Sequence, residues 1–264
     1  MALIEPEPYQ LTRKVDVARR FSKAATDYEQ FANIQLQIAS KTLSRLTGLR
    51  VERALDIGCG TGRHTAELAG IARCTEGLDL APGMVEVARQ QFPHILFVQG
   101  DAEQLPWTTP RFDIVYSSMA LQWCQSPMVA LAEIHRVLMS RGRAELAIMV
   151  DGSFAELVTA NRKANAGLQL NRLSAAQDWL NAAQQAGFTV TRSDVMTYTD
   201  TFTSLVTLLR SIKCVGAGSP TNKKTGLPVT RSRLKAVEQA MACTATGQLS
   251  NSYQVLHLSL EKPE

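Results

Sequence analysis

The sequence predicts an α/β fold in which a doubly wound, mostly parallel sheet of seven strands carries helices on both faces. Three observations predict this fold. Strand-like and helix-like segments alternate between residues 53 and 150, which is typical of a parallel sheet. The strand-like segments are continuous apolar runs, as expected for strands buried on both sides. A glycine-rich stretch, 58–62, joins the first such run to a helix-like segment.

The elements follow one another in a regular order. Residues 15–47 have near-helical apolar spacing, and Gly48 offers a stop. The strands of the parallel part are expected at 53–58, 74–80, 95–100, 112–118 and 144–150. The helices between them are expected at 64–69, 82–91 and 127–138.

The regular alternation of strands and helices ends after Val150. Helices are expected at 153–170, 174–186, 202–215 and 230–242, strands at 188–198 and 253–261, and a Gly- and Pro-rich loop at 216–228. We therefore expect three parts: a helical lid at 1–48, a ligand-binding core at 49–150, and the rest of the sheet at 151–264. The last part contains a helical insertion at about 200–240, which we expect to be a cap.

The composition is that of an ordinary globular protein, with 264 residues, 45% hydrophobic and 20% charged. No apolar run approaches the ~20 residues that span a bilayer, and the first residues lack an export signal. Five scattered cysteines and four histidines without ligand spacing favour reduced thiols and no metal site. We expect a cytoplasmic monomer that binds neither membranes nor nucleic acids.

The positive charge is concentrated in one stretch. No acidic residue lies between Asp200 and Glu238, whereas seven basic residues do: Arg210, Lys213, Lys223, Lys224, Arg231, Arg233 and Lys235. This stretch is either a solvated basic face or a landing surface for an acidic partner.

Acidic residues accompany the glycine-rich loop. Gly58, Gly60 and Gly62 would let the backbone turn sharply and approach a ligand closely. Their G-x-G-x-G spacing differs from the G-x-G-x-x-G of nicotinamide and flavin enzymes. Asp79 ends the second strand, where an acidic residue can take a ribose hydroxyl pair. Asp101 follows the third strand, where its carboxylate could accept a hydrogen bond from an adenine amino group.

Four motifs in order resemble the class I S-adenosylmethionine-dependent methyltransferases: "LDIGCGTG", "GLDLAPGMVEVAR", "GDAEQLP" and "FDIVYSSMALQW". The resemblance covers about residues 50–150 and implies a Rossmann-like fold with S-adenosyl-L-methionine as the cofactor. It also implies a set of cofactor-binding residues. Asp56, Gly58 and Gly60 are implied to hold the methionine moiety, with Ser117 and Ser118 near that end. Asp79 is implied at the ribose, and Met84, Asp101 and Ala102 at the adenine. Gly62 and Leu80 complete the implied set.

The flanking segments "ARRFSKAATDYEQFANIQ", "MALQWC", "LLRSIKCVGAG" and "LSNSYQVLHLSLEK" resemble one branch of this superfamily, the malonyl-acyl-carrier-protein O-methyltransferases of biotin synthesis. The resemblance implies transfer of a methyl group to the carboxylate of a malonyl thioester, on acyl carrier protein or coenzyme A. A carboxylate is already ionised at neutral pH, so this reaction needs no general base.

The acceptor site is expected on those flanking segments. Arg210 is the first candidate to grip the carboxylate, and Lys213 lies near the same helix face. Arg231 and Arg233 are alternatives for that role. Tyr28 is expected at the methionine end or the carboxylate.

Three further aromatic and amide side chains are candidates for the same region. Phe21 lies with Tyr28 on a helix that is either a lid or plain core packing. Gln122 and Trp123 follow the fourth strand, and either line the acceptor pocket or pack in the core.

Two other functions stay open at this point. The first is S-adenosylmethionine-dependent methylation of another small acceptor, such as a quinone carbon or a hydroxyl, which would need a base or an activated carbon. The second is a catalytically dead binding module that keeps the fold and loses the pocket.

Overall fold

The computed structural model describes residues 8–168, 172–214, 230–241 and 243–264, without the side chains of 8–13, 30, 31, 213 and 214. A seven-stranded sheet has the order β3–β2–β1–β4–β5–β7–β6. Its strands are β1 Val51–Ile57, β2 Ala72–Asp79, β3 Leu96–Gln99, β4 Phe112–Ser118, β5 Leu138–Met149, β6 Thr189–Phe202 and β7 Leu249–Glu261. The pairings of β7 with β5 and with β6 are antiparallel, and the other strand pairings are parallel. The predicted sheet is confirmed.

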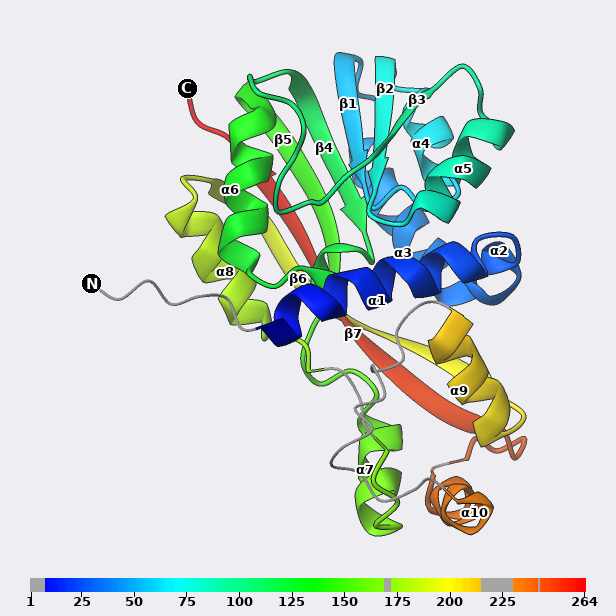
Figure 1. The fold of residues 1–264 in the computed structure, drawn as a ribbon. Coiled ribbons are helices and arrows are strands. Elements are labelled where there is room, and N and C mark those ends of the chain that lie inside the picture. The colour runs from blue at the N-terminus through cyan, green and yellow to red at the C-terminus, as the bar shows by residue number, and fades with distance from the viewer. Residues whose placement is uncertain (1–7, 169–171, 215–229, 242) are drawn as a thin grey trace.

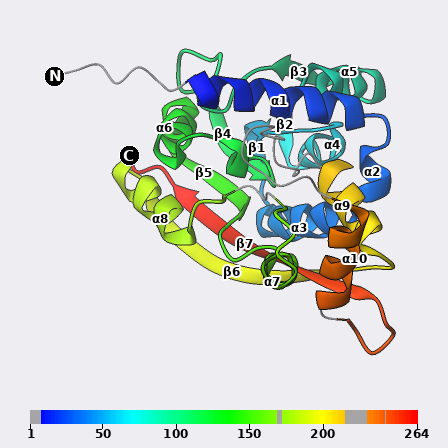
Figure 2. The same ribbon diagram turned by 60° about the horizontal axis from the view of Figure 1, so that its bottom comes forward.

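Helices cover both faces of the sheet (Figure 2). On one face, α6 (Pro127–Val137) and α8 (Ala176–Gln185) bury Ile134 and Trp179 against Leu55 and Leu146. On the other face, α3 (Asn33–Leu43), the 3-10 turn η1 (Ser44–Leu46) and α4 (Arg63–Leu68) pack near β1 and β4. The helix α5 (Pro82–Gln91) packs beside β3. The sheet is thus buried on both sides, as its apolar strands require.

The N-terminal helical segment is broken, although the sequence predicts one helix over 15–47. It forms α1 (Pro8–Ala24), α2 (Tyr28–Phe31) and α3, with a turn at residues 25–27. Thr26 and Asp27 favour such a turn because their short polar side chains compete for backbone hydrogen bonds. The break lets α1 cross the carboxyl ends of the strands while α3 lies on the sheet (Figure 1).

A second apolar core lies beyond the carboxyl ends of the strands. There α7 (Ala155–Lys163), α9 (Leu205–Cys214) and α10 (Arg231–Ala240) pack around β7. The helix predicted at 153–170 is shorter, because Asn161 bonds both the N–H and the C=O of Leu168 and so turns the chain back. The predicted loop at 216–228 lies outside the described residues. In the described part of the chain, no helix combines the length and apolar character needed to cross a membrane.

Candidate active site

The main cavity of the protein lies at the carboxyl ends of β1, β2 and β4, under α1. Its empty space, open mouth included, is about 720 Å³. The order of the strands reverses between β1 and β4. Open α/β sheets bind ligands at this switch point.

The glycine loop forms one wall of the main cavity. Gly58 has a φ of 77°, and a Cβ there would lie 2.1 Å from the Cβ of Ala120, so both the backbone angle and the lack of space require glycine. Gly60 has a φ of 54°, and a Cβ there would meet no atom within 4 Å. Gly62 is also predicted to bind the cofactor, but it is not among the residues that line the main cavity. It directly precedes α4, and a Cβ at this position would clash with the ring of Phe97.

Asp79 fixes the loop against the end of β2. Its carboxylate accepts hydrogen bonds from the backbone N–H of Gly60 at 2.9 Å and of Ala81 at 2.8 Å. Burial raises the pKa of Asp79, and these backbone bonds oppose the rise. Leu80 and Met84 also line the main cavity.

Asp56 lies below the loop and is only 2% exposed. It lines a smaller space, the loop cavity, together with Tyr28 and Gly58. Burial raises its pKa to about 7, nearby Asp79 adds to the rise, and a 2.7 Å hydrogen bond from Thr65 opposes it. A buried carboxyl in this state favours a cationic ligand group beside it.

Asp101 and Ala102 line the main cavity at its other end. The structure adds a contact that the sequence analysis misses: Lys14 of α1 pairs with Asp101 at 2.5 Å and with Glu103 at 2.6 Å. Lys14 also lines the cavity. The helix α1 is therefore fastened across the mouth by an ion pair.

The two serines at the end of β4 point in different directions. Ser117 is fully buried and donates to the backbone oxygen of Ile57 at 2.7 Å, so its side chain is occupied in the sheet. Ser118 lines both the main and the loop cavity, and its hydroxyl has no partner among the described residues. Ser118 is thus the better placed of the pair to meet a ligand.

Three aromatic rings close the main cavity. Phe21 of α1 packs edge-on against Trp123, with ring centroids 5.8 Å apart, and lies 6.3 Å from Tyr28. Burial and the carboxylates of Asp79 and Glu29 raise the pKa of Tyr28, so its hydroxyl stays protonated at neutral pH.

A further space, the side cavity, opens behind Tyr28 and Trp123. Gln122 lines it and donates from Nε2 to the backbone oxygen of Met119 at 2.6 Å. Tyr28 is shared by the main, side and loop cavities. The three spaces therefore meet at this residue.

Three of the four predicted basic residues, all arginines, lie off the lining of these cavities. Arg210 and Arg231 are exposed, on α9 and α10. Arg233 is half-buried on α10. Lys213 belongs to α9, and its side chain lies outside the described residues. Arg210, Arg231 and Arg233 are not among the residues that line the described cavities.

Gln35 of α3 is the other site residue that the sequence analysis misses. It is 8% exposed and lines both the side and the loop cavity. The available signal is its helical spacing: Gln35 shares the buried face of α3 with Ile38, Ala39 and Thr42, and a polar residue at a core position is unusual.

Comparison with known proteins places the chain in a family. A family model described as a methyltransferase domain matches residues 55–146. A malonyl-[acyl-carrier protein] O-methyltransferase from Serratia marcescens is 33% identical over 250 residues, covering 92% of this chain and 94% of that protein. The chain belongs to the malonyl-[acyl-carrier protein] O-methyltransferase family. The family resemblance of the sequence is thereby confirmed.

Some relatives of this methyltransferase family are longer. The biotin biosynthesis bifunctional protein BioHC from Cellvibrio japonicus is 34% identical over 253 residues, which cover 95% of this chain. The match covers 50% of BioHC, so the chain spans half the length of that bifunctional relative.

Solved structures share the fold of this family member at low identity. The YcgJ protein from Bacillus subtilis has a TM-score of 0.60 at 20% identity, covering 86% of this chain and 98% of that one. Geranyl diphosphate C-methyltransferase from Streptomyces coelicolor, solved with S-adenosyl-L-homocysteine, has a TM-score of 0.53 at 12% identity. The latter match covers 85% of this chain and 78% of the other.

Proposed function

We propose that this protein transfers the methyl group of S-adenosyl-L-methionine to the free carboxylate of a malonyl thioester, carried by acyl carrier protein or coenzyme A. The product is the malonyl methyl ester. Loss of the charge would let fatty-acid enzymes elongate the chain towards the pimeloyl precursor of biotin. The names of the relatives support this acceptor.

The observation that carries the proposal is the absence of a general base in the side cavity. Among its described lining residues there is no carboxylate, histidine or lysine. Tyr28 and Tyr253 line it, and burial raises the pKa of both phenols, so both stay protonated. A hydroxyl or ring-carbon acceptor must lose a proton during methylation, whereas a carboxylate is already ionised. The side cavity therefore favours a carboxylate over a quinone or hydroxyl acceptor.

The residues present fit the proposed cofactor. The open space over Gly60 leaves room for a ligand against bare backbone. Asp79 faces the main cavity where ribose hydroxyls would bind. Asp56, buried with a raised pKa, lacks the positive partner that the ammonium of an amino-acid end would supply. Leu80, Met84 and Ala102 would hold the adenine by apolar contact.

The protein itself contributes position and exclusion of water. When bound, S-adenosyl-L-methionine supplies a methyl group whose bond to sulfur breaks, with the electron pair left on sulfur, as the carboxylate oxygen bonds the carbon. No proton changes place. Tyr28 lies where the cavities meet, and Phe21 and Trp123 close the site from solvent. Orientation of this kind can remove about 7–11 kcal/mol of a barrier.

The exposed basic residues of α9 and α10 suit the carrier. Arg210, Arg231 and Lys235 face solvent, and α9 also places Ile212 on the side cavity. Acyl carrier proteins are acidic as a class, so this face would attract one beside the acceptor entrance. Within this proposal Arg210 meets the carrier, because its exposure separates it from the cavity lining.

An acceptor panel tests the proposal. The protein is incubated with methyl-labelled S-adenosylmethionine and, separately, malonyl-acyl carrier protein, malonyl-coenzyme A, free malonate and a demethylated quinone. We expect labelled methyl ester on the thioesters. Transfer to the quinone alone would reject the malonyl assignment, and transfer to nothing would favour a catalytically dead module.

A further inference from the structure

The side cavity contains polar groups that have no partner. Gln35 is 8% exposed and Gln122 is 9% exposed, and the Oε1 atom of each is buried without a hydrogen bond among the described residues. The indole Nε1 of Trp123 is in the same state. All three residues line the side cavity. Buried polar atoms cost free energy when unpaired, so three around one small space indicate a missing polar ligand.

The walls of the side cavity are also strained. Met119 and Phe154 line it and have φ values of 55° and 62°, in the left-handed region that residues with a Cβ rarely adopt. The backbone N–H of Met119 donates to the carbonyl of Ala147 at 2.8 Å, and that of Phe154 donates to the carbonyl of Ser252 at 2.7 Å, which helps to hold both residues in place. Strained backbone of this kind concentrates at functional sites.

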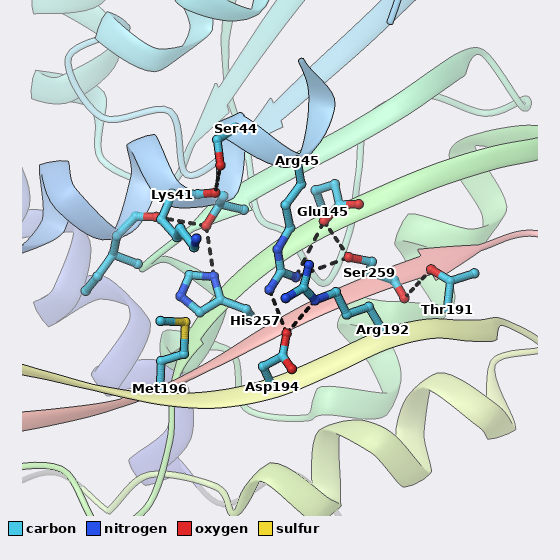
Figure 3. Close-up of polar contacts among 12 residues, drawn as sticks. Lys41, Ser44, Arg45, Glu145, Thr191, Arg192, Asp194, Met196, His257 and Ser259 are labelled. Atoms are coloured by element: carbon cyan, nitrogen blue, oxygen red, sulfur yellow. Dashed lines mark hydrogen bonds and ion pairs between the residues drawn. The ribbon is translucent and has the colours of Figure 1, made fainter. Parts of the chain in front are cut away.

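The helix that carries Gln35 is anchored by a partly buried polar network (Figure 3). At the end of α3, Thr42 contacts Nδ1 of His257 at 3.2 Å, and Tyr198 contacts Nε2 of the same ring at 2.7 Å. Arg45 in η1 reaches Asp194 of β6 at 3.0 Å and Glu145 of β5 at 3.9 Å. Strands β5, β6 and β7 therefore fix α3, and with it the position of Gln35.

Gln35 and Gln122 differ in what they can offer. Gln122 donates one Nε2 N–H to the backbone oxygen of Met119, which fixes the amide so that its Oε1 is the buried atom without a partner among the described residues. The Oε1 of Gln35 accepts no hydrogen bond among the described residues, and a side-chain amide can be turned over, so Gln35 can direct either its oxygen or its Nε2 towards the cavity. Trp123 can only donate. With the Gln35 amide turned so that its Nε2 faces the cavity, the cavity presents two donors, Gln35 and Trp123, and one acceptor, the Oε1 of Gln122.

We propose that Gln35 and Trp123 bind the acceptor carboxylate through uncharged N–H groups, while Gln122 accepts the N–H of the first amide in the pantetheine arm. The inference rests on the proposed function and names its acceptor subsite. Neutral donors hold an anion without cancelling its charge, which leaves the oxygen nucleophilic. No charged side chain competes for this role among the cavity's described lining residues.

Arg210 does not reach this subsite. It lies two residues before Ile212, which lines the side cavity, so about 200° of helix rotation separates the two side chains. Arg210 is exposed and Ile212 is 3% exposed, as this rotation requires.

The test compares Gln35→Met with the matched control Gln37→Met, because Gln37 lies on the exposed face of the same helix. For Gln35→Met we expect kcat/KM with malonyl-acyl carrier protein and affinity for malonyl-coenzyme A by calorimetry to fall about 10- to 100-fold. Affinity for S-adenosylhomocysteine should stay within about twofold, and Gln37→Met should match the wild type. Trp123→Phe, which removes the N–H and keeps an aromatic ring, should also lower acceptor affinity.

Three results would overturn the inference. The first is unchanged acceptor affinity in both Gln35→Met and Trp123→Phe. The second is an equal loss of acceptor and S-adenosylhomocysteine affinity, which would assign Gln35 to the cofactor through the loop cavity. The third is wild-type protein that methylates no malonyl thioester, which overturns the proposed function as well. An active wild type with unaltered variants rejects this inference alone.

Discussion

Asp56→Asn is predicted to raise the free energy of unfolding of the ligand-free protein at alkaline pH and to lower its enzymatic activity. Asp56 is 2% exposed, and burial raises its pKa from 3.8 to about 7. A carboxyl whose pKa is higher in the folded state stabilises the fold below pH 3.8, and this contribution is lost as pH rises through 7. Three pKa units correspond to about 4 kcal/mol. Asparagine avoids the loss, because it cannot ionise and its amide oxygen can still accept from Thr65.

The assay is urea unfolding of wild type and Asp56→Asn at pH 5 and pH 8. Part of the ~4 kcal/mol is already lost at pH 5, where the carboxyl is ionised in the unfolded chain, so the difference in free energy of unfolding should grow in favour of the variant by about 2.5–3 kcal/mol between pH 5 and pH 8. The exposed Asp151→Asn serves as the control and should show no such growth. Added S-adenosylhomocysteine should stabilise wild type more than Asp56→Asn at pH 8. A difference that is the same at both pH values would refute this reasoning.

Three further predictions concern the loop, the lid and the basic face. Gly58→Ala should abolish folding because of its clash with Ala120, whereas Gly60→Ala should fold with a loss of about 1–2 kcal/mol and lose cofactor affinity. Equal melting temperatures for the two variants would contradict this. Lys14→Met should release S-adenosylhomocysteine about 5- to 30-fold faster in stopped flow, because it removes the ion pair that holds α1 against Asp101. An unchanged dissociation rate would show that this ion pair does not hold α1 over the cavity. Arg210→Ala should raise KM for malonyl-acyl carrier protein about two- to fivefold. The control Arg73→Ala, at an exposed position, should leave KM unchanged. Equal changes of KM in the two variants would reject docking of the carrier at α9.

Much of the fold could be predicted because the residue types within each strand already indicate whether that strand is buried. The apolar runs that become β1, β4 and β5 are buried on both sides, and the glycine loop needs positive φ values that glycine supplies. Asp79 was found by its place at the end of a strand. These signals need no knowledge of distant contacts.

The missed residues depend on contacts that are remote in sequence. Lys14 contacts Asp101, which lies 87 positions away in the sequence. Gln35 becomes a candidate site residue only because the fold brings it to the same cavity as Gln122 and Trp123. Ser117 and Ser118 alternate across β4, so a strand-end motif alone does not fix which of them faces the ligand.

The exposure of Arg210 was available from the sequence. Leu208 and Ile212 are buried on α9, and helical periodicity places the residue midway between them on the opposite side.

Intact-mass spectrometry of malonyl-acyl carrier protein tests the central claim most directly. After incubation with this protein and S-adenosylmethionine, the carrier should gain the mass of one methylene group, and mild esterase treatment should remove the gain. A malonyl carrier whose mass is unchanged, under conditions where the protein binds S-adenosylhomocysteine, would contradict the account.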